Sequence, residues 1–243
     1  LVSIVVPTFN EQDNIAPLFD AIDSSMPDGV RYEYVFVDDG STDDSVKTIK
    51  AIGLDRDDLR LLVFTRNFGH QAAISAGLEF SSGAAVAVMD GDLQDPPEVL
   101  PEFFSKWKEG YEVVYAIRRR RKENMFKRLA YFCFYRILTV FADINIPLDS
   151  GDFSVMDRQI VDKLNELPER NRFVRGIRAW LGYRQIGLEY ERQERFSGKT
   201  KYTFTKLSNL AYDGLISFSR RPLIVATKLG ILITSIAFLT IFI

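Results

Sequence analysis

The sequence has very few residues of the types that build cross-links or multi-histidine sites. Its 243 residues include one cysteine, Cys133, and one histidine, His70. A single cysteine excludes an internal disulfide and fits a reducing compartment, and a single histidine excludes a metal site made of several imidazoles. The net charge of -2 carries no signature of nucleic-acid binding. The sequence has neither a glycine-rich dinucleotide fingerprint nor a P-loop lysine motif, so any bound phosphate would have to be held by a metal ion and basic side chains.

Short apolar runs alternate with helical patterns through the first half of the chain. The predicted strands are 1–6, 32–37, 59–65, 86–89 and 112–117, and the predicted helices are 14–25, 44–52, 71–80 and 103–109. This alternation predicts an α/β fold with a mostly parallel sheet and helices on both faces. A chain of this length can form one sizeable domain with an appendage.

Polar clusters follow four of these strands, at Phe9–Glu11, Asp38–Asp43, Arg66–His70 and Asp90–Gln94. The carboxyl ends of parallel strands share one edge of a sheet, where open α/β sheets bind their ligands. Each cluster alone also fits a turn or a helix cap. Four of them at four strand ends favour a binding site. A ring such as Phe9 suits a base, and the carboxylates Asp38 and Asp39 suit a base N–H or a ribose hydroxyl.

The last of these clusters offers donors for a hard cation. Asp90, Asp92 and Gln94 place carboxylate and amide oxygens on a tight turn. Such oxygens suit Mg²⁺ or Mn²⁺, which complete their coordination with water and substrate phosphates. An Asp-x-Asp pair by itself also fits an acidic loop.

Four motifs stand in order along the chain. They are Pro7-x-x-Asn10-Glu11, Asp38-Asp39-Gly40-Ser41-x-Asp43, Arg66-Asn67-x-Gly69 and Asp90-Gly91-Asp92-Leu93-Gln94-Asp95-Pro96-Pro97. Together they resemble the family-2 glycosyltransferases, most of all the branch that transfers a sugar to polyprenyl phosphate. The resemblance implies a GT-A fold, a nucleotide-sugar donor and inversion at the anomeric carbon.

The resemblance also implies roles for individual residues. Asp90 would lie near the donor sugar or ribose, and Asp92 with Gln94 would hold Mg²⁺ or Mn²⁺ on the diphosphate. The residues expected to hold the nucleoside are Pro7, Phe9, Glu11, Asp38 and Asp39. A later segment, Arg195 to Tyr202, is similar to the family's Arg-x-x-Gly-x-Ser-Lys-Tyr loop, with Thr200 in place of serine. Its basic residues Arg195, Lys199 and Lys201 suit a loop that closes on the diphosphate.

Acceptor-side residues are expected in the second half of the chain. The basic run Arg118, Arg119, Arg120 and Arg121 fits a phosphate or an anionic headgroup, or else a solvated loop. A turn further on carries two carboxylates, of which Asp152 is the first candidate for the acceptor site and Asp149 the second. A phosphate acceptor is already ionised, so a strong general base is not required.

Three segments carry membrane signals. The aromatic-rich helix predicted at 125–141 fits the membrane interface or an ordinary core. Residues 1–202 are expected to form the catalytic domain, and 203–221 an amphipathic juxtamembrane helix. The apolar stretch 222–243 is long enough, at ~1.5 Å per residue, to span a bilayer. Arg220 and Arg221 place the preceding side in the cytoplasm, and a second transmembrane helix is expected beyond Ile243.

We therefore predict a metal-dependent, inverting hexosyltransferase of the inner membrane. Its expected donor is UDP-glucose, and its expected acceptor is polyprenyl phosphate at the cytoplasmic face. Membrane lipid is a further expected partner, and no binding of nucleic acid is expected. Two alternatives stay open: transfer to a saccharide hydroxyl, which needs a true base, and an inactive nucleotide-sugar-binding scaffold. The sugar, the nucleoside and the oligomeric state, including a homo-oligomer, also stay open.

Overall fold

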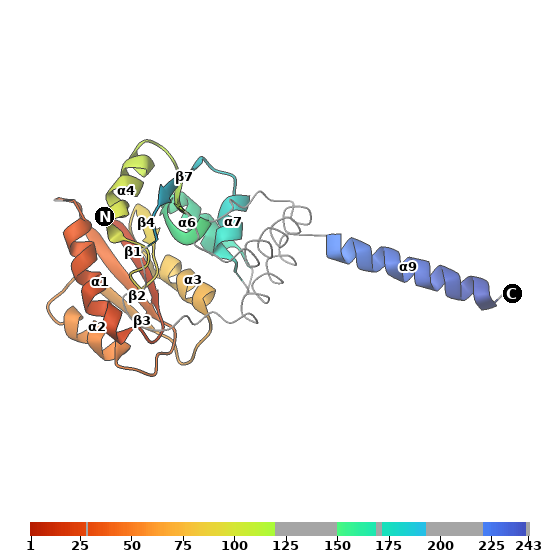
Figure 1. Cartoon of the computed structure of the whole chain (residues 1–243), viewed down its shortest axis with the longest axis horizontal. Coiled ribbons are helices and arrows are strands. Elements are labelled where there is room, and N and C mark those ends of the chain that lie inside the picture. Colours follow the sequence, from red (N-terminus) through yellow and green to blue (C-terminus); the bar gives the residue numbers. More distant parts are fainter. Residues whose placement is uncertain (28, 120–149, 169–171, 193–220, 242–243) are drawn as a thin grey trace. The chain divides into compact units, whose positions relative to one another are not determined.

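The computed structural model describes residues 1–27, 29–119, 150–168, 172–192 and 221–241 (Figure 1). The chain divides into two compact units, one of residues 1–122 with 147–200 and one of residues 123–146 with 201–243. The described part of the second unit is helix α9 (Arg221–Ile241). The predicted helices at 125–141 and 203–221 lie outside the described residues.

The first unit is built on a sheet of seven strands in the order β3-β2-β1-β4-β6-β5-β7. The strands are β1 (Val2–Thr8), β2 (Tyr32–Asp38), β3 (Leu59–Val63), β4 (Ala85–Val88), β5 (Val113–Arg118), β6 (Ser150–Asp157) and β7 (Gln185–Tyr190). Strand β6 pairs antiparallel with both β4 and β5, and the other described pairs are parallel. The mostly parallel α/β sheet predicted from the sequence is confirmed.

Helices follow the strands as the sequence pattern predicts. They are α1 (Gln12–Ser25), α2 (Ser45–Gly53), α3 (His70–Phe80), the 3₁₀ turn η1 (Pro97–Val99), α4 (Leu100–Lys108), α6 (Arg158–Glu166) and α7 (Val174–Trp180). The predicted boundaries of the helices and strands in the first half differ from the observed ones by three residues at most. The sequence pattern did not predict α6, α7 or β7.

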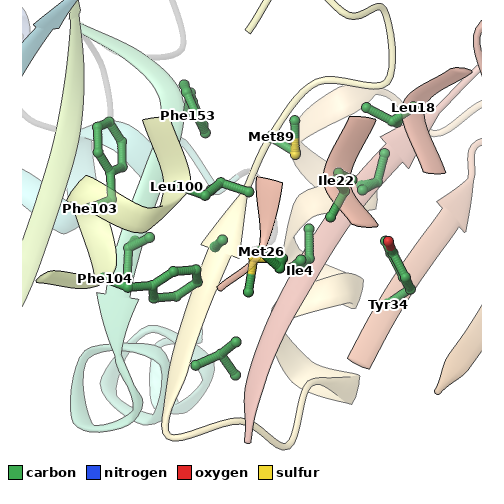
Figure 2. Packing of buried hydrophobic residues seen from close by; sticks show 14 of the residues in the cluster. Ile4, Leu18, Ile22, Met26, Tyr34, Met89, Leu100, Phe103, Phe104 and Phe153 are labelled. Carbon is green, nitrogen blue, oxygen red and sulfur yellow. The ribbon is translucent and has the colours of Figure 1, made fainter. Parts of the chain in front are cut away.

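One face of the sheet packs against α1 and α4. Alternate residues of β1 such as Ile4 and Val6 join a buried cluster with Phe36 of β2, Leu18 of α1 and Phe103 of α4. Figure 2 shows this packing, with Ile4, Leu18 and Ile22 on one side and Leu100, Phe103 and Phe153 on the other. Each fully buried aliphatic or aromatic side chain contributes about 1.5–3 kcal/mol, so this cluster holds the strand ends in place.

The opposite face of the sheet packs against α3. Gly77 of α3 lies directly against Val5 of β1 and close to Val37 of β2, so that a side chain at this position would collide with the sheet. Figure 1 shows α1 and α3 on opposite sides of β1 and β2. Strands buried on both faces read as continuous apolar runs, and β1 is buried throughout. The prediction of helices on both faces is confirmed.

The helix predicted at 222–243 is present as α9, which begins at Arg221 and ends at Ile241. Eight of its large apolar side chains are between 47% and 63% exposed in the structure, from Ile224 to Leu239. In the part of the chain that the structure describes, no helix meets the combined length and hydropathy of a membrane span. The membrane span therefore stays a prediction.

Candidate active site

Loops that follow four strands meet the first residues of β6 at one edge of the sheet. The loop after β1 is joined to the loop after β2 by a hydrogen bond from Asn10 N to Ser41 Oγ of 2.8 Å. The loop after β2 is joined to the one after β3, where Phe68 N donates to Asp39 Oδ1 at 2.6 Å. His70, which follows β3, lies near both Asp90 after β4 and Asp152 at the start of β6. The meeting of the loops that follow β1, β2, β3 and β4 was predicted from the polar clusters, but that prediction did not include the start of β6.

The turn after β1 is held rigidly against the loop after β2. Glu11 N donates to Ser45 Oγ at 2.9 Å, and Thr42 N donates to Asn10 Oδ1 at 2.8 Å. Asn10 has a φ of 52°, in the left-handed region that asparagine tolerates better than most residues. Of the predicted nucleoside contacts, Pro7 is buried near the end of β1, Glu11 is buried after the turn, and Phe9 is half-buried.

Asp38 has a buried carboxylate oxygen at this edge that could accept a hydrogen bond from a ligand. It is fully buried at the end of β2, and its Oδ2 accepts from Ser41 N at 2.9 Å. Its Oδ1 is also buried, and among the described residues it has no hydrogen-bond partner. A buried acceptor without a partner costs about 1–3 kcal/mol. An N–H or O–H group of a bound nucleoside would remove that cost.

Asp39 holds the neighbouring loop. Its Oδ2 accepts from Gly69 N at 2.9 Å, in addition to the bond between its Oδ1 and Phe68 N. Burial raises the pKa of Asp39, and these backbone donors oppose the rise. Gly40 has a φ of +72°, and a Cβ there would lie 2.5 Å from the carbonyl carbon of Arg66. The two loops thus pack backbone to backbone, and a nucleoside contact by Asp39 stays a prediction.

The acidic turn after β4 carries the candidate metal ligands. Asp92 is buried, and its Oδ1 accepts from Gln94 N at 3.1 Å. Leu93 between them has a φ of 59°, a strained conformation for a bulky residue. The described residues contain no group of three or more His, Cys, Asp or Glu arranged to hold a metal. Since Mg²⁺ is usually held by one or two carboxylates plus water and substrate phosphates, the oxygens of Asp92 and Gln94 fit a site that the substrate completes.

His70 links the acidic turn after β4 to the start of β6. Its Nε2 lies 3.5 Å from Asp90 Oδ1 and 3.4 Å from Asp152 Oδ2. Burial lowers the pKa of His70, but Asp152 and Asp90 outweigh it and raise that pKa to about 9. The imidazole is therefore a cation at neutral pH, shared by the two carboxylates.

Asp152 is held by side chains from two helices. Gln71 of α3 donates from Nε2 to Asp152 Oδ2 at 3.1 Å, and its Oε1 accepts from Val174 N of α7 at 2.9 Å. Arg175 of α7 places its Nε 3.5 Å from Asp152 Oδ1, and its Nη1 donates to Ser150 O at 2.6 Å. These contacts tie α7 to the start of β6.

The charges around Asp152 decide its chemistry. Burial would raise the pKa of Asp152, but Arg175 and His70 outweigh it and hold that pKa well below its usual range. Arg178 of α7 is buried beside it, donates weakly to Gly151 O at 3.5 Å, and has its own pKa lowered by burial to about 10. Three cationic side chains therefore surround one carboxylate.

A second cluster lies where β5 and β7 end. The hydroxyl of Tyr190 donates to Asp95 Oδ1, and Arg118 Nε lies 3.4 Å from the Tyr190 oxygen. Arg192 lies 3.8 Å from both Asp95 and Asp90. Burial and Asp90 raise the pKa of Asp95 to about 6, against the opposing effect of Arg118. This network connects the acidic turn to the last described strand.

The predicted acceptor residues divide in the structure. Arg118 is half-buried and would lie 3.1 Å from a Cβ at Gly151, so it borders the site. Arg119 is exposed and pairs with Glu189 at 2.9 Å. The predicted site residues outside the described part of the chain are Arg120, Arg121, Asp149, Arg195, Lys199 and Lys201.

Sequence reasoning missed several residues that the fold brings to the site, namely Gln71, Tyr190, Arg192 and the α7 arginines Arg175 and Arg178. It placed His70 in a strand-end cluster without giving it a role. The solitary histidine at a strand end was a usable signal. Nothing in the local pattern near Arg175 marked it, because its position depends on packing between α7 and β6.

The fold has close counterparts among solved glycosyltransferases. Glucosyl-3-phosphoglycerate synthase from Mycobacterium tuberculosis, solved with Mn²⁺, UDP-glucose and phosphoglyceric acid, gives a TM-score of 0.64 at 19% identity, over 89% of this chain and 78% of that one. The mannosyltransferase PcManGT from Pyrobaculum calidifontis, solved with GDP-mannose and Mn²⁺, gives 0.56 at 24% identity, over 77% and 54%. At these identities the likeness shows a GT-A-like fold alone.

Relatives in sequence are much closer. The uncharacterized glycosyltransferase YkcC of Bacillus subtilis is 45% identical over 243 residues, which cover 99% of this chain and 75% of the relative. The bactoprenol glucosyl transferase of Shigella phage SfV is 40% identical over 241 residues, 98% of this chain and 78% of the relative. The sequence model of glycosyl transferase family 2 matches residues 3–164. The chain therefore belongs to glycosyl transferase family 2.

Proposed function

We propose that this protein transfers a hexose, with inversion, from a nucleoside diphosphate sugar to a polyprenyl phosphate, and that the donor is UDP-glucose. Relatives at about 40% identity are named bactoprenol glucosyl transferases, which supports this acceptor and this sugar. The M. tuberculosis neighbour solved with UDP-glucose supports the donor class.

The observation that carries the choice of acceptor is the surroundings of Asp152. A sugar hydroxyl would need a general base, and a good base has a pKa near the working pH. Asp152 is paired with His70 and Arg175, which hold its pKa well below the usual range. It is therefore a weak proton acceptor. A phosphate acceptor brings its own ionised oxygen and needs no base, so the same three residues suit it.

The reaction then follows from positions at the sheet edge. The free oxygen of Asp38 accepts a hydrogen bond from the nucleoside. An oxygen of the acceptor phosphate attacks the sugar C1 from the face opposite the leaving group, and the bond from C1 to the diphosphate oxygen breaks with its electron pair on the nucleotide. A bound Mg²⁺ or Mn²⁺ would neutralise the leaving diphosphate, and Asp92 with Gln94 would hold it. Solved neighbours contain Mn²⁺ or Mg²⁺ with nucleotides, which supports a divalent ion.

Membrane attachment with the catalytic domain in the cytoplasm completes the proposal. A polyprenyl tail keeps its phosphate at the membrane surface, so the enzyme must work there. The exposed apolar side chains of α9 support a lipid contact, since contiguous apolar surface of this kind marks a membrane or protein partner.

The test is label transfer from UDP-[¹⁴C]glucose into undecaprenyl phosphate by the purified full chain with Mn²⁺. We expect lipid-linked label that disappears with EDTA and in Asp92→Asn. Label that enters an added oligosaccharide but not the lipid would contradict the acceptor. UDP-glucose binding without transfer to any acceptor would support an inactive binding protein instead.

A further inference from the structure

The side chains around Asp152 carry more positive charge than one carboxylate requires. His70 and Arg175 contact its two oxygens, and the buried Arg178 donates to Gly151 O at 3.5 Å. Arg118 adds a fourth cation near Gly151. Two other carboxylates offset part of this charge. Asp90 lies near His70 and Arg192, and Asp95 interacts with Arg118. The acceptor side nevertheless keeps a local excess of cations, which fits an anionic group.

Hydrogen bonding at this place is also incomplete. The buried atoms Asp152 Oδ1 and Arg175 Nε face each other at 3.5 Å as an ion pair without a hydrogen bond, and the buried Arg178 Nε makes no hydrogen bond with any described residue. Buried donors of charged groups rarely stay unsatisfied. Arg175 and His70 differ from Arg178 in being reachable: their side chains are 20% and 31% exposed, whereas Arg178 is 2% exposed.

We propose that Arg175 and His70 form the subsite that binds the phosphate monoester of the acceptor, with Asp152 as the counterion that holds both cations in position. Arg175 is anchored to β6 through Ser150 O, and a guanidinium suits a phosphate because it can donate two parallel hydrogen bonds. His70 also contacts Asp90, so a phosphate held there lies next to the expected position of the donor sugar. The subsite depends on the function proposed above, because it takes a phosphate acceptor.

Steady-state kinetics of the full chain with UDP-glucose and farnesyl phosphate test the subsite. We expect Arg175→Gln and His70→Gln to raise the KM for farnesyl phosphate about 10- to 100-fold, the loss expected for one charge-assisted hydrogen bond. The KM for UDP-glucose should change less than about twofold. Arg175→Lys should recover part of the loss, because it keeps the charge but not the fork. Arg184→Gln is the matched control, since Arg184 is exposed at the opposite end of β7 and contacts Tyr111.

Two further arms separate the ways this inference can fail. Titration of UDP-glucose by calorimetry reports whether each variant is folded. If Arg175→Gln does not fold, Arg175→Lys takes its place in the comparison of KM values. An unchanged KM for farnesyl phosphate in folded Arg175→Gln and His70→Gln would overturn the subsite while leaving the function intact. If the wild type transfers no sugar, the function fails, and binding of farnesyl phosphate with UDP present then decides: weaker binding in Arg175→Gln supports the subsite and equal binding overturns it. Inorganic phosphate as sole acceptor should yield no glucose 1-phosphate, and its formation would assign the subsite to free phosphate instead.

Discussion

Replacement of Asp152 by asparagine separates a counterion from a general base. The substitution keeps the shape of the side chain and removes the charge that faces His70, Arg175 and Arg178. Removing one partner of a buried ion pair costs about 3–5 kcal/mol. Because the amide keeps hydrogen-bonding capacity, we expect a loss of about 2–4 kcal/mol in the free energy of unfolding, or roughly 5–15 °C in Tm.

The effect of Asp152→Asn on turnover should be modest. Loss of a general base lowers kcat about 10²- to 10⁴-fold, whereas loss of a counterion should lower kcat by no more than about tenfold and raise the acceptor KM. Asp157→Asn is the control at the other end of β6. Asp157 caps α6 by accepting from Gln159 N at 3.0 Å, and its other oxygen accepts from Trp107 Nε1 at 2.8 Å. Asparagine caps a helix as well as aspartate does but has only one acceptor oxygen, so the replacement should cost about 1 kcal/mol for the lost hydrogen bond and leave the kinetics unchanged.

An NMR titration of the same variant reports the electrostatics directly. His70 is the only histidine of the chain, so its imidazole resonance needs no assignment by mutagenesis. The pKa of about 9 in the wild type should fall in Asp152→Asn, because one of the two carboxylates that raise it is gone. A kcat at least 1,000-fold lower, with Tm and the His70 pKa both unchanged, would refute the counterion role and restore Asp152 as the base.

Three further predictions concern neighbouring positions. The pKa of His70 is raised from 6.5 to about 9, so its contribution to stability is complete below pH 6.5 and is lost as pH rises through 9; urea unfolding should show about 1–3 kcal/mol lost across that window in the wild type and little of it in His70→Gln. Gly40→Ala should cost about 2–4 kcal/mol in urea unfolding, because the new Cβ meets the Arg66 backbone at positive φ; a loss below about 0.5 kcal/mol would contradict the packing. Asp38→Asn should weaken UDP binding about 10- to 100-fold by calorimetry, with little change in Tm because the amide oxygen can still accept from Ser41 N; unchanged affinity would remove Asp38 from the nucleoside site.

The half of the sheet edge formed by the loops after β1 to β4, which we assign to the sugar donor, could be predicted because each loop directly follows its own strand in the sequence. Each strand in this half ends in its own polar cluster, and parallel strands bring those ends together whatever the details of packing. Asp38 and Asp90 therefore follow from chain order alone. The acceptor half could not be predicted in the same way. It depends on β6, which runs antiparallel to its neighbours and so brings Asp152, near its beginning, to this edge. It also depends on Arg175, which comes from a helix of only seven residues.

The proposed reaction brings together two phosphate-bearing substrates that repel each other. In the described part of the site, different side chains suit the phosphates of the donor and of the acceptor. The donor side carries the carboxylates Asp38, Asp39 and Asp92, which suit a nucleoside and a divalent ion. The acceptor side carries Arg175, which suits a phosphate directly, whereas Arg178 is buried beside Asp152. His70 lies between the two sides, with one nitrogen near a carboxylate of each. A neutral residue there would leave Asp90 and Asp152 without their shared cation, and their mutual repulsion would act against the short distance that in-line attack requires. On this reasoning the charge of His70 matters more than its ability to transfer a proton.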